Sequence, residues 1–155
     1  MHYSAISPSL YVGTCPMDAG DVEELARLGV AAVLNVQTDE DLAFWGIRWE
    51  ELEAEYRDWS IVVRRVPVRD FDPDALRRGL PDCVRALDEL IRAGHIVYVH
   101  CSAGINRSPS TVIAYLHWIA GWELDEAIAH VTNRRACDPY VEAIEAAGAD
   151  REHPS

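Results

Sequence analysis

The sequence has no apolar run that approaches the roughly 20 residues of a membrane-spanning helix. Its first segment, MHYSAISPSLYVG, has no basic region and no long apolar core, so we expect no secretory signal there. Repeats, low-complexity segments and interdomain linkers are also missing. A chain of 155 residues with this pattern is expected to form one domain with a real core. We place that domain at residues 1–148 and a tail at 149–155.

Metal-binding patterns are missing as well. The four cysteines, Cys15, Cys83, Cys101 and Cys137, form no CxxC pair and have no zinc-like spacing with histidine. We therefore expect no metal and no cofactor. In a domain of this size the default is reduced thiols in a cytosol-like compartment, so we expect a cytoplasmic protein. A plastid location stays open, because a transit peptide that had been removed would leave no trace in the sequence.

Basic residues are few. The formal net charge is −12, which disfavours nucleic acid and anionic membrane surfaces as partners. Such a charge still permits a small anion to bind in a locally positive pocket. We expect a monomer that binds neither nucleic acid nor membranes.

Short apolar runs alternate with helical patterns along the chain. Strands are expected within residues 7–13, 30–37, 60–68 and 95–100. Helices are expected at residues 21–29, within 39–59 after a polar loop, from about Leu80-Pro81 to residue 94, and at 107–120, 123–135 and 138–148. Asp21 is the expected N-cap of the first helix, and Gly29 is its expected stop. The alternation predicts an α/β fold with a central, mostly parallel sheet flanked by helices.

The stretch VYVHCSAGINRSPS, at residues 97–110, joins an expected strand to an expected helix. Ligands of such folds sit beyond the carboxyl ends of strands. A strand, a tight turn and a helix N-terminus direct several backbone N–H groups into one concavity, which makes an anion site. The turn residues expected to bind phosphate are Ser102, Ala103, Gly104, Ile105, Asn106 and Arg107.

The side chains of this turn add chemistry to the anion site. Arg107 supplies a planar fork that fits two phosphate oxygens. The field that binds a dianion also favours a thiolate at Cys101, which is then poised for in-line attack on phosphorus. Ser108 is placed to hydrogen-bond the sulfur and to help it leave. His100 is expected to orient the loop rather than to act as a base.

Cleavage of a phosphate ester also needs an acid to protonate the leaving oxygen. The segment VPVRDFDPDAL follows the strand expected at residues 60–68 and offers Asp70, Asp72 and Asp74. The carboxyl end of that strand faces the same edge as the cysteine loop. Spacing alone does not choose among the three carboxyl groups.

The loop HCSAGINRS resembles the phosphate-binding loop of the cysteine-dependent dual-specificity phosphatases. YSAISPSLYVGTCP, DVEELARLGV, LNVQTDEDLAFWGI and RDFDPDALRRGLP are similar, in order and spacing, to segments of one branch. That branch is the laforin-related glucan phosphatases of plant starch metabolism. The resemblance covers roughly residues 3–140 and implies a protein tyrosine phosphatase-like fold and phosphate-ester hydrolysis through a phosphocysteine.

The resemblance also implies roles for particular residues. Cys101 matches the nucleophile of the family, Arg107 the phosphate clamp, and Asp70 the general acid. The aromatic channel that holds the sugar chain in the glucan branch matches Phe44, Trp45 and Phe71, with Tyr3 as a further candidate. A phosphorylated glucan, similar to starch or glycogen, is therefore the expected substrate.

One position departs from the glucan pattern. Asn106 stands where glucan phosphatases usually carry glycine, and the form AGxNRS also occurs among dual-specificity phosphatases that act on proteins. Asparagine tolerates left-handed backbone angles, and we expect its side chain to narrow or repolarise the pocket rim. A phosphatase for phosphotyrosine and phosphoserine/threonine therefore stays open as the alternative. A non-catalytic phosphate- or glucan-binding module is a third hypothesis, which the sequence disfavours because such modules usually lack the cysteine or the arginine and this chain has both.

Overall fold

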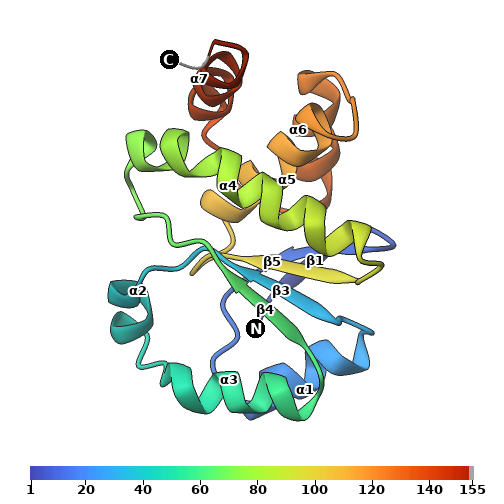
Figure 1. Cartoon of the computed structure of the whole chain (residues 1–155), viewed down its shortest axis with the longest axis vertical. Coiled ribbons are helices and arrows are strands. Elements are labelled where there is room, and N and C mark those ends of the chain that lie inside the picture. Colours follow the sequence, from blue (N-terminus) through green and yellow to red (C-terminus); the bar gives the residue numbers. More distant parts are fainter. Residues whose placement is uncertain (154–155) are drawn as a thin grey trace.

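The computed structural model describes residues 1–153 and arranges them around a single five-stranded sheet (Figure 1). The strands are β1 (Tyr3–Ser7), β2 (Leu10–Gly13), β3 (Ala32–Asn35), β4 (Val62–Arg65) and β5 (Val97–His100). The helices are α1 (Ala19–Arg27), α2 (Asp39–Phe44), α3 (Trp49–Asp58), α4 (Pro73–Arg92), α5 (Arg107–Trp118), α6 (Leu124–Arg134) and α7 (Val141–Glu152).

The strand order across the sheet is β1-β2-β5-β3-β4. β2, β5, β3 and β4 run parallel, and β1 pairs antiparallel with β2 at one edge. The predicted α/β fold with a mostly parallel sheet is confirmed. In the register, His100 lies between Gly13 and Asn35, so β5 ends in the middle of the carboxyl edge.

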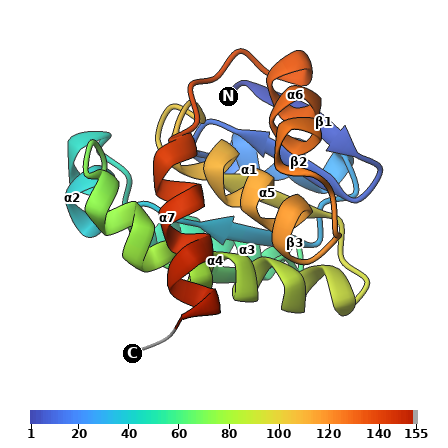
Figure 2. The ribbon, with the colours of Figure 1, turned by 90° about the horizontal axis from the view of Figure 1, so that it is seen from above.

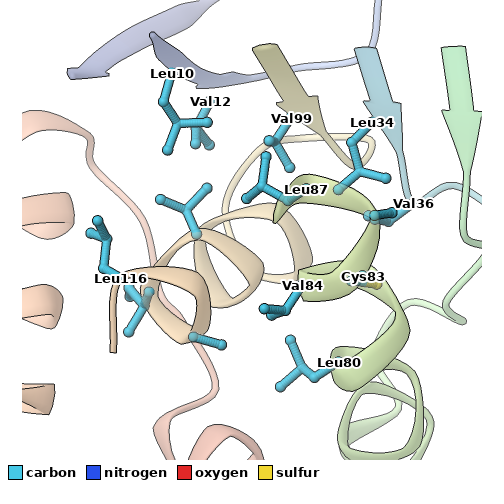
Figure 3. Close-up of a cluster of buried hydrophobic side chains, with 14 of the residues drawn as sticks. Leu10, Val12, Leu34, Val36, Leu80, Cys83, Val84, Leu87, Val99 and Leu116 are labelled. Carbon is cyan, nitrogen blue, oxygen red and sulfur yellow. The ribbon is translucent and has the colours of Figure 1, made fainter. Parts of the chain in front are cut away.

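Helices cover both faces of the sheet. α4, α5, α6 and α7 lie on one side, and α1 and α3 lie on the other (Figures 1 and 2). Each face has its own buried apolar cluster. β5 serves both: Val97 and Val99 belong to the α4/α5 side and Tyr98 to the α1/α3 side, as the two-residue period of a strand requires. Figure 3 shows Leu34 and Val99 of the sheet opposite Leu87 of α4.

The long helix α4 begins earlier than the sequence predicted. Asp72 caps it, its side chain accepting from the N–H of Ala75 at 3.0 Å, and Pro73 occupies the first turn. Pro81 therefore lies inside the helix, not at its start. The buried stripe continues across Pro81, from Leu80 to Cys83 and beyond, so packing compensates for the hydrogen bond that proline cannot donate.

Other boundaries also differ from the prediction. The N-cap of α1 is Asp18, whose side chain accepts from the N–H of Asp21, and Asp21 lies in the first turn. Gly29 follows α1 with φ +84°, in agreement with its predicted role. α2 forms where a polar loop was expected, and β1 was not expected at all. α7 continues to Glu152, four residues into the predicted tail, and residues 154 and 155 lie outside the described part of the chain.

Within residues 1–153, we find no helix that combines the length and the apolar character needed to cross a membrane.

Candidate active site

Cys101 lies directly after β5, where the chain turns toward α5. Its side chain is buried, and Sγ is 3.2 Å from the hydroxyl oxygen of Ser108 in the first turn of α5. The parallel pairing of β5 with β2 and β3 brings the chain to this point, in the middle of the carboxyl edge. The thiol therefore sits at the bottom of the turn with a hydrogen-bond partner within reach of its sulfur.

His100 is fully buried beneath the turn. Its Nδ1 is 2.9 Å from the carbonyl oxygen of Cys101, so the neutral ring donates its proton to that carbonyl. Burial lowers the pKa of His100 to about 4, although this hydrogen bond acts in the opposite direction. A neutral ring that holds a loop carbonyl agrees with the predicted orienting role.

The turn itself has free donors on its inner side. In the described chain, none of the backbone N–H groups of residues 102–106 donates to a protein acceptor. The left-handed position of the turn is Gly104, with φ +66°. The Ser102 hydroxyl accepts from the Gln37 amide at 3.0 Å and is held at the edge of the turn. This arrangement has the donors that a small anion needs.

Arg107 is the first residue of α5 and is only 2% exposed. One guanidinium nitrogen, Nη1, donates to a carboxylate oxygen of Asp41 and to the carbonyl of Val68, both at 2.7 Å. The other, Nη2, is 3.1 Å from Asp70 and 3.5 Å from the Ser102 hydroxyl. Nε is buried and has no partner in the described structure. Nε therefore retains donor capacity for an anion, while Nη1 anchors the group and Nη2 faces Asp70 and Ser102.

Asp41 belongs to the site, although the sequence gave no reason to place it there. It is in the first turn of α2 and forms a capping box with Thr38, whose backbone N–H donates to the same oxygen that Arg107 contacts. Burial would raise the pKa of Asp41, but the bonds from Arg107 and Thr38 outweigh it and lower the pKa. The pattern Thr38-x-x-Asp41 could have revealed the helix, but not the contact with an arginine 66 residues away.

The three carboxyl groups that the sequence spacing left open as the general acid have different surroundings in the structure. Asp70 is half-buried, with a carboxylate oxygen 3.1 Å from Nη2 of Arg107. Asp72 is occupied as the N-cap of α4, and Asp74 is exposed in the first turn of that helix. Among the three, Asp70 alone contacts Arg107 in the described structure.

Phe71 follows Asp70 in an unusual backbone conformation. Its φ is +56°, a region that a bulky residue rarely adopts, and its side chain is 87% exposed. Its N–H donates to a carboxylate oxygen of Asp70 at 3.0 Å. The turn therefore displays an apolar ring to solvent and at the same time fixes the neighbouring carboxylate.

A groove of about 480 Å³ leads to the turn. Three aromatic side chains line it, those of Phe44, Trp45 and Phe71, and it also contacts Asp70 and Ala103. The ring of Phe44 meets that of Trp45 edge to face, with centroids 5.3 Å apart. The structure thus brings together three of the four aromatic residues expected in a sugar channel.

Tyr3 does not line this groove, so the groove gives no support to its expected place in the channel, which stays a prediction. It lies on β1, at the far edge of the sheet from β4. Its hydroxyl is 3.1 Å from Glu24 of α1, and its ring packs against Tyr11. These two contacts are made with α1 and β2.

Asn106 also differs from expectation. Its φ of −122° is not left-handed, so the backbone makes no special demand for glycine or asparagine there. Its side-chain amide donates to the carbonyl of Asp138 at 2.8 Å and does not line the groove. The amide is therefore turned toward Asp138, and the groove gives no support to the expected change of the rim. Ile105 is 47% exposed and likewise lies outside the groove lining.

In residues 1–153, no cluster of three or more His, Cys, Asp or Glu side chains is arranged to hold a metal ion.

Comparison with known proteins finds relatives along most of the chain. The family model "Dual specificity phosphatase, catalytic domain" matches residues 10–142. The chain is 38% identical over 144 residues to Phosphoglucan phosphatase LSF1, chloroplastic, of Arabidopsis thaliana, covering 93% of this chain and 24% of that protein. It is 35% identical over 152 residues to Phosphoglucan phosphatase DSP4, amyloplastic, of Castanea sativa, covering 97% and 40%. Laforin of Mus musculus is 33% identical over 135 residues, covering 80% and 41%. The chain thus spans less than half the length of these relatives.

Solved structures share the fold. The crystal structure of PTPMT1 superposes with a TM-score of 0.77 at 21% identity and covers 97% of this chain and 94% of that one. Tk-PTP in the active form gives 0.78 at 22% identity and covers 99% and 97%. These likenesses confirm the predicted protein tyrosine phosphatase-like fold.

Proposed function

The chain belongs to the dual-specificity phosphatase family, and from this premise we propose that it hydrolyses phosphate monoesters of a phosphorylated glucan through a phosphocysteine intermediate. The proposal takes residues 1–148 as a single catalytic domain. The observation that carries the substrate class is the aromatic groove. Its lining includes Asp41 and Asp70, which contact Arg107, and Ser102, which follows Cys101 in the chain.

In the first step, the phosphate dianion binds to the N–H groups of the turn and to the guanidinium group of Arg107. The thiolate of Cys101 attacks phosphorus, and a sulfur–phosphorus bond forms as the bond to the sugar oxygen breaks. Asp70 gives its proton to the departing oxygen, so that the glucan leaves as a neutral alcohol. The contact between Asp70 and Arg107 supports this assignment, since it keeps the acid beside the bound phosphate.

In the second step, the Asp70 carboxylate takes a proton from a water molecule that attacks phosphorus. The sulfur–phosphorus bond breaks, Cys101 leaves as thiolate, and inorganic phosphate is released. Ser108 donates to the departing sulfur, a role supported by its distance of 3.2 Å from Sγ.

The character of the groove favours a sugar chain. Aromatic rings pack against the apolar C–H faces of sugars and need no complementary charge. Phe44, Trp45 and Phe71 are 80%, 42% and 87% exposed, so their rings are available to a ligand. A net charge of −12 does not oppose binding of an otherwise neutral polysaccharide.

The test compares phosphate release from phosphorylated amylopectin with release from phosphotyrosyl peptides, per active site. We expect faster release from the glucan, and we expect Trp45→Ala to lose most of that advantage. Trp59→Ala is the matched control, because Trp59 is 46% exposed and lies outside the groove. Faster peptide turnover without glucan binding would favour the protein phosphatase alternative. Glucan binding with no hydrolysis of either substrate would favour the binding-module alternative.

Compartment and assembly belong to the same proposal. We propose a monomer in a reducing compartment, the cytoplasm or a plastid. Two of the relatives carry plastid designations in their names, which supports the plastid alternative for a chain of this kind. A fluorescent fusion of the full-length protein and light scattering of the purified chain would test the two statements.

A further inference from the structure

The carbonyl groups on the outer side of the phosphate-binding turn all accept hydrogen bonds from the protein, whereas the N–H groups on its inner side donate to no protein acceptor. Four consecutive carbonyl groups of the turn point away from the cradle, and each accepts a hydrogen bond. The donors are the N–H of Cys15 to Ser102 at 3.0 Å, Nη2 of Arg135 to Ala103 at 3.3 Å, Nε of Arg135 to Gly104 at 2.6 Å, and the N–H of Asp138 to Ile105 at 2.7 Å. A single side chain, that of Arg135, thus holds two of the four.

Arg135 is fixed in a way that suits this contact. It stands at the end of α6, is half-buried, and its third nitrogen, Nη1, donates to the Ser4 hydroxyl on β1 at 3.2 Å. Its planar fork therefore spans two successive carbonyls and a neighbouring strand. A rigid fork loses less freedom per bond than a flexible ammonium group would.

Gly104 shows how close this contact is. A Cβ atom at Gly104 would lie 2.6 Å from Nη2 of Arg135 and 2.6 Å from the backbone carbonyl carbon of Gly13. The turn is thus enclosed between the guanidinium group and the end of β2, with no room for a side chain. Its left-handed φ of +66° makes glycine necessary for a second reason.

A second contact joins the turn to the same segment. The amide of Asn106 donates to the carbonyl of Asp138, while the N–H of Asp138 donates to Ile105. The segment Arg135–Asp138 therefore holds the turn at both ends of its carbonyl side.

These bonds bear directly on phosphate binding. A peptide group whose carbonyl is held outward must direct its N–H group inward, toward the cradle. A cation at the carbonyl end also polarises the peptide and strengthens its N–H as a donor. We propose that Arg135 is a positioning residue of the phosphate cradle: it touches neither the phosphate nor the sulfur, but it keeps the N–H groups of the turn aimed at the phosphate. The inference rests on the proposed function, since it takes phosphate as the ligand of the turn.

The test uses Arg135→Gln and Arg135→Lys, with Arg134→Gln as the matched control. Arg134 carries the same charge on the preceding residue, is exposed, and donates only within its own helix, to the carbonyl of His130 at 3.0 Å. Three quantities are measured: the dissociation constant of inorganic phosphate, kcat/KM for an aryl phosphate, and the ratio of Cys101 alkylation rates with iodoacetate and iodoacetamide. The ratio reports how well the cradle attracts an anion, which a loss of global stability alone would not change. Thermal melting of each variant monitors the fold.

For Arg135→Gln we expect weaker phosphate binding, a lower alkylation ratio and a loss of about 10- to 100-fold in kcat/KM. Arg135→Lys should lie between this variant and the wild type, because it keeps the charge and loses the fork. Arg134→Gln should stay within about twofold of the wild type. If Arg135→Gln does not fold, Arg135→Lys decides by the same measurements.

Two outcomes would overturn the inference, and they differ in whether the proposed function survives. If the wild type hydrolyses the aryl phosphate and binds phosphate, but both Arg135 variants match it, the positioning role is wrong and the proposed function stands. If the wild type neither hydrolyses the ester nor binds phosphate, the proposed function fails and the positioning role fails with it.

Discussion

The chemical role proposed for Cys101 depends on the groups around its sulfur more than on the burial of its side chain. Another buried cysteine, Cys83 in α4, packs in the apolar core, and burial raises the pKa of its thiol to about 12. Cys101 is equally inaccessible but lies beneath a turn of unpaired N–H groups, with a hydroxyl beside its sulfur. The same side chain is thus an apolar filler in one place and a candidate nucleophile in the other.

Cys101→Ser should abolish hydrolysis of an aryl phosphate while phosphate binding persists, because a serine hydroxyl at this point is not ionised and the donors of the cradle remain. Steady-state kinetics and calorimetric titration with inorganic phosphate measure the two effects. Cys83→Ala removes a buried thiol outside the site and should lower stability without lowering turnover per folded molecule. Residual turnover in Cys101→Ser would contradict the phosphocysteine mechanism.

Phe71 retains a strained backbone beside the candidate acid. Replacement by alanine removes the ring but keeps a Cβ at φ +56°, whereas glycine removes both. We therefore expect Phe71→Gly to be more stable than Phe71→Ala by about 0.5–1 kcal/mol, the reverse of the usual order. Urea unfolding measures the difference. Both variants should lose glucan binding to the same extent, and a more stable alanine variant would show that the turn is not strained.

At the level of elements, the helices that carry the site begin and end according to local chemistry. Asp72 and Pro73 start α4 directly after the candidate acid, so the cap of the helix also fixes the end of the loop that holds Asp70. The capping box of α2 fixes the start of a short helix whose last residue is Phe44 and whose C-cap is Trp45. Asp70 and the two aromatic residues thus each lie within one or two turns of a capped helix start.

The cost of an interior proline in α4 can be measured at Pro81. Proline there cannot donate to the carbonyl one turn earlier, so Pro81→Ala should restore that bond and raise the free energy of unfolding by about 1–3 kcal/mol. Thermal melting measures the gain. Pro73→Ala is the control, since proline in the first turn has no intrahelical bond to lose. A loss of stability in Pro81→Ala would mean that α4 needs a bend at this position to follow the core.

For the molecule as a whole, the stability should depend on pH through His100. Its pKa is lowered from 6.5 to about 4 in the fold, so between these values the unfolded chain binds a proton that the folded chain does not. The free energy of unfolding therefore falls as pH drops through this window, by about 2 kcal/mol from pH 7 to pH 5. Asp41, whose pKa is also lowered, adds to the loss only at still lower pH.

Urea unfolding midpoints at the two pH values measure this effect. His100→Asn removes the titrating ring and should flatten the dependence, whereas His2→Gln, at an exposed position, should leave it unchanged. An equally steep dependence in His100→Asn would assign the effect to other groups.

The sequence predicted features set by neighbouring residues, such as strands, helices and the turn at Cys101. It did not predict contacts between residues far apart in the chain. The alternation of short strands and helices predicted the fold, and the strand–turn–helix around Cys101 predicted a turn with free N–H groups at the carboxyl edge of the sheet. The start of α4 was misjudged because Pro81 was taken as a first-turn proline, whereas Asp72 and Pro73 supply the cap and the first turn eight residues earlier. The sequence could not show that Tyr3 lies outside the groove lining, because only the folded sheet places β1 at the edge opposite β4. Asp41 and Arg135 reach the site through contacts over 66 and 31 residues, which no single-sequence pattern encodes.

Asp41 has one further consequence. Its carboxylate belongs both to the start of α2, which carries Phe44 at its other end, and to the anchor of Arg107. Under the proposed function, a sugar chain in the aromatic groove and a phosphate in the cradle therefore both bear on the same carboxylate, and any coupling between the two sites is reciprocal. A phosphorylated chain is then held at two points. When the bond to the sugar oxygen breaks in the first step, the glucan loses its hold at the cradle and keeps only its contacts in the aromatic groove.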